Sequence, residues 1–215
     1  MSSLLKWSIQ NSDANRDGPG APSDAQPPAE RDPSRGLNPE LLAQLLGGPS
    51  DADRMREAMT AIVSPELDLE NKIIAFDNFE QLIENLDNAN NMEVLGLWMP
   101  LVQQLDSTEP ELQRFAAWCI GTAVQNNIKC QDRCLAVGAV PKLVKLAVSG
   151  ANAPLRKKAV YALSSEVRNY QPGLDTMVQA LPAEFRGEDR LDAEDMEAVD
   201  VVINRLREAA TSSAS

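Results

Sequence analysis

A helical stretch that occurs twice constrains the fold of this 215-residue chain more than any other feature. Residues 111–127 recur 43 positions later as residues 154–170. The identical pairs are Leu112/Leu155, Ala116/Ala159, Val124/Val167 and Asn126/Asn169, and the similar pairs are Arg114/Lys157, Trp118/Tyr161 and Ile120/Leu163. A period of about 40–47 residues with helical spacing is typical of HEAT and armadillo arrays, which stack around one core and present a long surface to a partner. The repeat therefore predicts a binding scaffold.

A third copy of the pattern lies upstream. Residues 69–86 fit the same frame at an offset of 41, which places Ala75 over Ala116 and Asn85 over Asn126. Three helices in about 42 residues favour armadillo units over two-helix HEAT units. We predict an all-α fold, an armadillo-like helical repeat array (α-solenoid) with a disordered N-terminal segment.

Composition divides the chain into three predicted parts. Residues 1–36 are a flexible segment, because a short apolar cluster is followed by a proline-rich stretch with hardly a large apolar residue. Residues 37–180 hold the helical repeats. Residues 181–215 are an acidic linker followed by a C-terminal capping helix with a frayed tail, since an array needs an amphipathic end piece.

Local signals place the helix boundaries within the repeats. We expect a helix from Ser50 or Asp51 to Ser64, a second from Asp68, an Asn/Asp-rich turn at 87–91 and a third helix carrying residues 92–105. We expect a capping box at 108–111, two helices separated by Gly138, a helix start at Asn152 and a helix end at Pro172-Gly173. Asp192 is predicted to cap the last helix, with Met196, Val199, Ile203 and Leu206 on its apolar face and with Arg205 and Arg207 in its last turn.

The composition argues against most enzyme classes. There is no histidine, which removes the commonest general base and metal ligand at neutral pH. Cys119, Cys130 and Cys134 have no paired CxxC spacing, and we interpret them as small core residues or free thiols. No phosphate-binding loop of the GxxxxGK[ST] type occurs. We therefore expect no enzyme activity, no cofactor and no metal site.

Charge is distributed unevenly along the chain. Residues 111–168 contain nine Lys and Arg against three Asp and Glu, a local charge of +6 in a chain of −12, so the rest carries −18. Arg156, Lys157 and Lys158 lie at the start of their helix, where cations are mildly unfavourable. Together with Arg168 they either contact an acidic partner, or form a solvated face or pair with the acidic C-terminal segment. The overall acidity argues against nucleic acid as a partner.

Several stretches together resemble one known family. They are LLKWSIQNS, LLAQLLGG, SPELDLENK, AFDNFEQLIENLDNANN, IGTAVQNN and KAVYALSSEVRN. The chain resembles the armadillo-type nucleotide exchange factors of heat shock protein 70 chaperones, the fungal Fes type related to the animal HspBP proteins. The resemblance implies binding to the chaperone ATPase domain, faster ADP release, and release of client polypeptide through a flexible N-terminus that competes for the substrate groove.

The resemblance also implies which residues contact the chaperone. The N-terminal residues Leu4, Leu5, Trp7 and Ile9 would mimic substrate, although Trp7 packing onto the array remains an alternative. The turn Leu86, Asp87, Asn88, Ala89, Asn90 and Asn91 would lie at the ATPase-domain contact, with Ala89 as a close-packed small residue. Asn126 and Asn127, in the matching stretch IGTAVQNN, are further candidates. From their charge alone, Arg156, Lys157, Lys158 and Arg168 complete the set.

One departure from the family pattern matters. The resemblance implies that longer members of the family carry a fourth repeat, with a basic residue that helps to hold the chaperone. No residue of this chain can be given that role from the sequence. An alternative function is an armadillo peptide-binding adaptor without exchange activity. The Trp-x-x-x-Asn ladder of such adaptors is absent, because Val102 follows Trp98 and Thr122 follows Trp118 at that spacing.

The remaining predictions concern location and assembly. The apolar stretch in the first ten residues is too short for a signal peptide, and polar residues follow it at once. No stretch approaches the roughly 20 apolar residues that a membrane-spanning helix needs. We expect a cytoplasmic protein that is monomeric and binds neither membrane nor nucleic acid.

Overall fold

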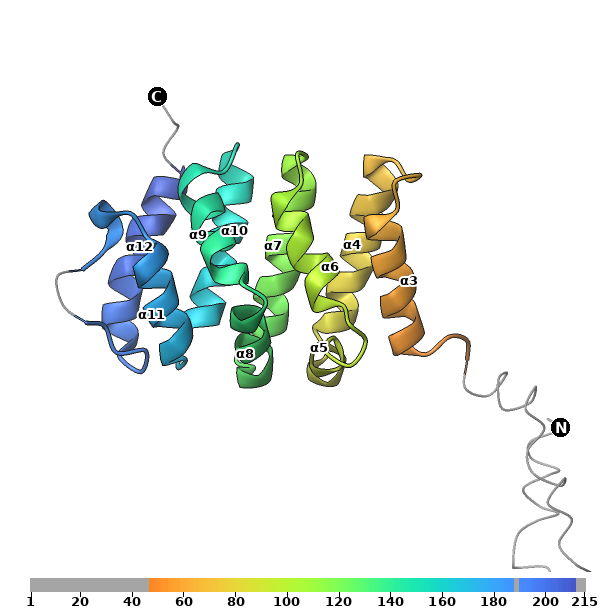
Figure 1. Cartoon of the computed structure of the whole chain (residues 1–215), viewed down its shortest axis with the longest axis horizontal. Helices are drawn as coiled ribbons and strands as arrows, with labels where there is room; N and C mark the ends of the chain where they lie inside the picture. Colours follow the sequence, from red (N-terminus) through yellow and green to blue (C-terminus); the bar gives the residue numbers. More distant parts are fainter. Residues whose placement is uncertain (1–46, 188–189, 212–215) are drawn as a thin grey trace, which may run out of the picture. The chain divides into compact units, whose positions relative to one another are not determined.

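Long helices recur at a regular interval in the computed structural model, which describes residues 47–187 and 190–211 (Figure 1). They are α4 (Leu69–Ile83), α7 (Pro110–Val124), α10 (Ala153–Val167) and α12 (Met196–Thr211). Their first residues are 41, 43 and 43 positions apart. The predicted period is therefore confirmed, and it extends to a fourth long helix that similarity between the copies did not reveal.

Shorter helices connect the long ones. They are α3 (Asp51–Val63), α5 (Leu86–Asn91), α6 (Trp98–Gln103), α8 (Ile128–Ala136), α9 (Ala139–Ser149) and α11 (Gln171–Ala180), with 3-10 turns η3 (Gln104–Asp106) and η4 (Ala183–Phe185). Every regular element in the described ranges is a helix, so the predicted all-α class is confirmed. The predicted flexible segment 1–36 and the apolar stretch before Gly47 lie outside the described residues and stay predictions.

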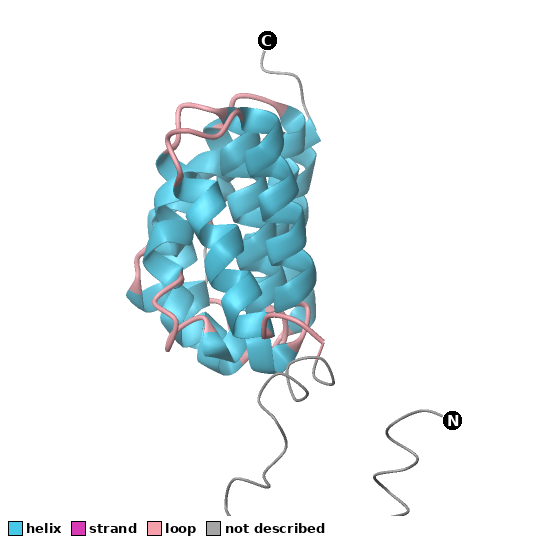
Figure 2. Ribbon diagram, turned by 90° about the vertical axis from the view of Figure 1, so that its right-hand side faces the viewer, coloured by secondary structure: helices cyan, strands magenta, loops and turns pink. Residues whose placement is uncertain are grey.

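The helices form two layers. α4, α7, α10 and α12 contact one another in sequence order and make one layer, and α3, α6 with η3, α9 and α11 make the other (Figure 1). Figure 2 shows the helices running along a common direction, with loops gathered at the two ends. Side chains from both layers, including Phe76, Phe79, Ile120, Leu143 and Leu163, are fully buried in a continuous core. Among the described residues no helix is both long and apolar enough to cross a membrane.

The last long helix, α12, covers the C-terminal end of the array. Val199, Ile203 and Leu206 are buried as predicted, whereas Met196 is half-buried. Asp195 begins the helix, because its Oδ1 accepts a hydrogen bond from the Ala198 backbone N at 3.0 Å. The prediction that Asp192 is the cap is therefore wrong. The helix also continues to Thr211, so Arg205 and Arg207 lie before its last turn.

The predicted Asn/Asp-rich turn at 87–91 is instead the short helix α5. Asn85 caps it, since its side chain accepts hydrogen bonds from the backbone N of Asp87 at 2.9 Å and of Asn88 at 3.4 Å. Ala89 is only 2% exposed and joins the core. Capping and burial of Ala89 together outweigh the weak helix propensity of these residues.

Two further boundaries differ from prediction because left-handed residues end or delay the helices. Asn169 has a φ of 55° and follows the end of α10, so Pro172 and Gly173 lie inside α11 rather than ending its predecessor. Gly96 has a φ of 68°, and the helix expected over 92–105 begins only at Trp98. Asparagine and glycine tolerate this backbone region better than other residues.

The start of α7 was predicted only in part. Pro110 is its first residue, as the sequence indicated, but Glu109 is the N-cap and makes no side-chain capping bond. The expected capping box at 108–111 is therefore wrong. By contrast, Ser50, Asp68 and Asn152 cap their helices as predicted, each through a side-chain oxygen that accepts a backbone N–H.

Gly121 permits the close approach of α7 to α10. An ideal Cβ added there would lie 2.5 Å from Cε1 of Tyr161 and 3.0 Å from Cα of Ala162. Glycine to alanine within a helix ordinarily stabilises by about 1 kcal/mol, but here the two helices must separate. We expect Gly121→Ala to lower the free energy of unfolding by about 1–3 kcal/mol, measured by urea denaturation. Thr60→Ala, at an exposed helical position, serves as the control, and a stabilised Gly121→Ala protein would contradict the close packing.

Candidate functional site

The exposed surface of the long-helix layer carries three adjoining depressions that share Tyr161. The first, of about 440 Å³, is lined by Arg114, Pro154, Lys157, Lys158 and Tyr161. The second, of about 490 Å³, is lined by Glu80, Glu84, Trp118, Thr122, Gln125, Asn126 and Tyr161. The third, of about 270 Å³, is lined by Gln125, Asn126, Tyr161, Ser164, Ser165, Arg168 and Arg207. We call these three depressions together the Tyr161 groove.

Lys158 lies between two aromatic rings in this groove. Its Nζ is 3.8 Å from the centroid of the Trp118 ring and 5.5 Å from that of the Tyr161 ring. Partial burial lowers the pKa of Lys158, and the nearby Glu80 carboxylate opposes the shift. Cation–π contact with two rings fixes the ammonium group at a defined place on the surface.

Stacking of the repeats brings matching positions of neighbouring long helices together. Trp118 and Tyr161 are aligned in the sequence repeat and lie side by side in the groove. Thr122 Oγ1 donates a 2.6 Å hydrogen bond to Glu80 Oε1 across 42 residues of sequence. Burial raises the pKa of Glu80, and this hydrogen bond opposes the increase. Arg114 is held by Glu111, whose Oε2 accepts bonds of 3.0 and 2.6 Å from Nε and Nη2.

Helix α5, which the family resemblance placed at a partner contact, divides into exposed and internal residues. Leu86 is 57% exposed and Asp87 is also exposed, so both are available to a partner. The Asn88 amide donates to the Leu82 carbonyl at 2.9 Å and to Asp51 Oδ2 at 3.1 Å, and Ala89 is buried in the core. Asn90 and Asn91 are half-buried. Ala89 therefore belongs to the packing of the array itself, and we leave it out of the contact surface.

Asn126 and Asn127 have different local roles. Asn126 is exposed with a φ of 52°, like its repeat partner Asn169, so the repeated asparagine marks a left-handed link. Asn127 is 5% exposed and caps α8, where its side chain accepts from the backbone N of Cys130. Asn85 caps α5 in the same way, so its counterpart is Asn127 and the predicted alignment with Asn126 is shifted by one residue.

Two of the basic residues assigned to a partner are engaged within the array. Arg156 is 8% exposed, and its guanidinium donates to the carbonyls of Gly150 at 3.0 Å and Ala210 at 3.2 Å. Arg168 forms an ion pair with Asp200 of α12. The alternative interpretation, attraction to the C-terminal segment, is therefore confirmed for Arg168. Lys157 is exposed and Lys158 is half-buried, and both lie on the long-helix face.

Three residues on this surface were given no partner role by the sequence analysis. Ile128 is 55% exposed as the first residue of α8, matching Leu86 as the first residue of the neighbouring helix α5. Tyr161 is shared by all three depressions. Arg207 of α12 lines the third depression, whereas the sequence analysis placed it in the C-terminal helix without a role toward a partner. The 43-residue start-to-start interval was the signal that could have placed Arg207.

The three cysteines are free and buried in the described part of the chain. Burial raises the pKa of Cys130 to about 12 and raises those of Cys119 and Cys134 well above the ordinary thiol value. A thiol must ionise to act as a nucleophile, and burial opposes the ionisation of these three. Within the described part of the chain no group of three or more Cys, Asp or Glu side chains is arranged to hold a metal ion.

Comparison with known proteins identifies the family of the chain. The family model described as nucleotide exchange factor Fes1 matches residues 1–92, and the SIL1/FES1/HPBP1 C-terminal domain matches residues 88–179. An Hsp70 nucleotide exchange factor FES1 of Gibberella zeae is 53% identical over 97% of this chain and 95% of its own length. The chain belongs to the Fes1 family.

Relatives within the Fes1 family differ in length. An Hsp70 nucleotide exchange factor FES1 of Coccidioides immitis is 50% identical over 97% of both chains. One of Kluyveromyces lactis is 47% identical over 79% of this chain but only 55% of its own length. The chain thus spans nearly the whole length of the first two relatives and about half the length of the third.

Proposed function

We propose that this Fes1-family chain binds the ATPase domain of cytosolic heat shock protein 70, accelerates ADP release and promotes release of bound client polypeptide. The observation that carries the proposal is 53% identity across nearly the whole chain to a protein named Hsp70 nucleotide exchange factor. The chain acts by binding, and the partner holds the nucleotide. The N-terminal residues Leu4, Leu5, Trp7 and Ile9 are proposed to compete for the client groove, and they lie outside the described residues.

The proposed mechanism is differential binding. The array prefers a conformation of the ATPase domain in which the nucleotide cleft is distorted, and this preference speeds ADP loss. By linkage, ADP weakens the complex by the same coupling free energy. We further propose that the chain acts as a monomer in the cytoplasm, without binding nucleic acid or membrane.

The proposed contact surface consists of residues whose side chains are not buried in the packing of the array. Leu86, Asp87, Asn126 and Ile128 lie around the starts of α5 and α8, and α5 and α8 contact one another. Exposed apolar side chains at a surface of polar residues are typical anchors of an interface. Lys157, Lys158 and Arg207 extend this surface along the long-helix layer.

Stopped-flow release of fluorescent ADP from heat shock protein 70 tests the proposal. We expect the wild-type chain to accelerate ADP release. In the double variant Leu86→Asp, Ile128→Asp the acceleration should be smaller by a factor of about ten or more, because charged residues replace two apolar anchors. Met99→Asp is the matched control, since Met99 is 53% exposed on α6 in the other layer. If the wild-type chain leaves ADP release unchanged, the peptide-binding adaptor becomes the better interpretation.

A further inference from the structure

No carboxylate lines the cationic end of the Tyr161 groove. The depression there is lined by three cations, a proline and a tyrosine, with no acidic side chain. Arg114 is paired with Glu111, but within residues 47–187 and 190–211 neither Lys157 nor Lys158 has a carboxylate partner. Two lysines that form no ion pair therefore line the same open depression in a chain that is strongly acidic overall, and Glu80 acts on Lys158 only from beyond ion-pair distance.

Lys158 is preorganised for an anion. The Trp118 and Tyr161 rings hold its ammonium group, yet its three N–H donors make no hydrogen bond to any residue that the structure describes. A flexible lysine loses rotamer entropy when it binds, and Lys158 has already lost part of that freedom. Because the group is half-buried, its attraction to a carboxylate is screened less than that of a lysine in solvent.

The opposite side of the groove carries the opposite sign. Glu80 and Glu84 of the α4 end line the second depression, which meets the cationic one at Tyr161. A partner segment that crosses the groove is therefore oriented by charge, with its acidic part toward α10. Complementary charge of this kind contributes to specificity and to the association rate.

We infer that the groove between α7 and α10 receives an acidic element of the chaperone ATPase domain, one carboxylate of which is bound by Lys158 over the Trp118 ring with Lys157 beside it. The inference rests on the proposed function and specifies the chemistry of the partner surface. The aromatic rings Trp118 and Tyr161 are positioning residues, because they act through the lysine that they hold.

Affinity for the isolated ATPase domain of heat shock protein 70, measured by fluorescence anisotropy at two salt concentrations, tests the inference. Lys158→Met keeps the stem over Trp118 and removes the charge. We expect it to weaken binding about tenfold and to reduce the dependence of affinity on salt, because loss of one member of a desolvated charge pair costs more than loss of an exposed one. Lys158→Arg keeps the charge and is expected to retain most of the affinity.

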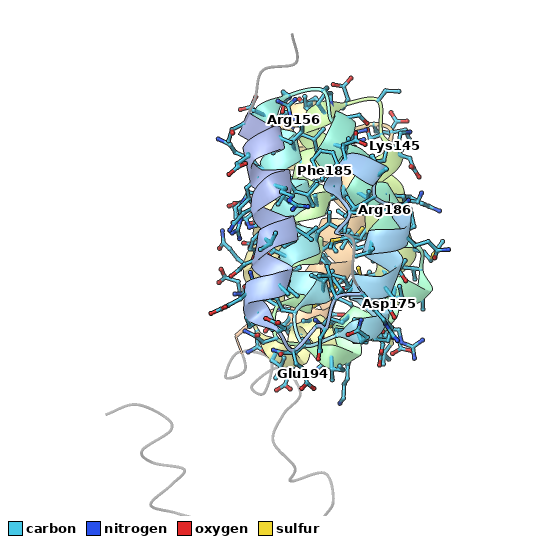
Figure 3. The ribbon with its side chains drawn as sticks, turned by 90° about the vertical axis from the view of Figure 1, so that its left-hand side faces the viewer. Lys145, Arg156, Asp175, Phe185, Arg186 and Glu194 are labelled. Atoms are coloured by element: carbon cyan, nitrogen blue, oxygen red, sulfur yellow. The ribbon has the colours of Figure 1, made fainter. Side chains whose placement is uncertain are left out.

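The control is Lys145→Met, which removes an exposed lysine from α9 in the other layer; Figure 3 shows Lys145 and Arg156 toward the top of the view, on opposite sides. If the wild-type chain binds and accelerates ADP release while Lys158→Met binds equally well with the same salt dependence, the inference is overturned and the proposed function stands. If the wild-type chain neither binds the ATPase domain nor accelerates ADP release, both are overturned.

Discussion

Glu166→Gln is expected to stabilise the protein at pH 8.5 by on the order of 4 kcal/mol. Glu166 is fully buried, and neither carboxylate oxygen lies within hydrogen-bond distance of a nitrogen or oxygen donor among the described residues. Burial raises the pKa of Glu166 to about 8 from an ordinary value of 4.5; weak hydrogen bonding by the Cys134 thiol opposes the increase, and the nearby Asp132 carboxylate adds to it. One unit of pKa corresponds to about 1.4 kcal/mol, so ionising this group in the folded state is costly.

The direction of the pH dependence follows from the raised pKa. The folded state holds the Glu166 proton more tightly than the unfolded state, so stability is fully present below about pH 4.5 and is lost progressively as the pH rises through 8. Glutamine cannot ionise, so the variant keeps its stability over this range. Near pH 5 the two proteins should unfold at similar urea concentrations.

Urea denaturation of both proteins at pH 5, 6.5 and 8.5 measures the difference. Glu184→Gln, which neutralises an exposed carboxylate on η4, should follow the wild-type curve at every pH. A wild-type protein whose stability is constant between pH 5 and 8, or a Glu166→Gln protein that unfolds in less urea at pH 8.5, would show that the buried group is not a neutral acid.

Sequence patterns predicted the elements whose causes are local. The caps at Ser50, Asp68 and Asn152 act within three residues, and the apolar spacing of α7 and α10 is complete within each helix. The helical interval was predicted for the same reason, because two copies still share enough residues to align. The local prediction that was wrong is the turn at 87–91, which is the helix α5. There the burial of Ala89 in the core outweighs the weak helix propensity of the segment.

The candidate site was predicted less well because its geometry depends on distant residues. Lys158 was selected by charge, but the ring that holds it belongs to Trp118, one repeat earlier. Stacking makes aligned positions of successive repeats neighbours. The alignment of Trp118 with Tyr161 was therefore enough to predict that the two rings lie side by side. The role of Arg168 depends on Asp200, 32 residues later, in a helix whose sequence no longer resembles the other copies.

Arg156 shows how one local anomaly is resolved at a distance. Its charge lies in the first turns of α10, where the helix dipole is unfavourable, which suggested a partner outside the molecule. The side chain instead reaches the carbonyls of Gly150, at the end of α9, and Ala210, in the last turn of α12. A cation near the C-terminal ends of two helices is favourable, so the arginine joins α12 to the rest of the array.

Arg156→Met is therefore expected to lower the free energy of unfolding by about 3 kcal/mol, because two buried carbonyls lose a charged donor. Relative to wild type, amide hydrogen exchange in the Arg156→Met variant should become faster in α12 than in α7. Lys157→Met, at the adjacent exposed position, should change stability by less than about 0.5 kcal/mol. ADP release per folded molecule should be unchanged in Arg156→Met. A variant that is as stable as wild type but slow in ADP release would instead assign Arg156 to the chaperone contact.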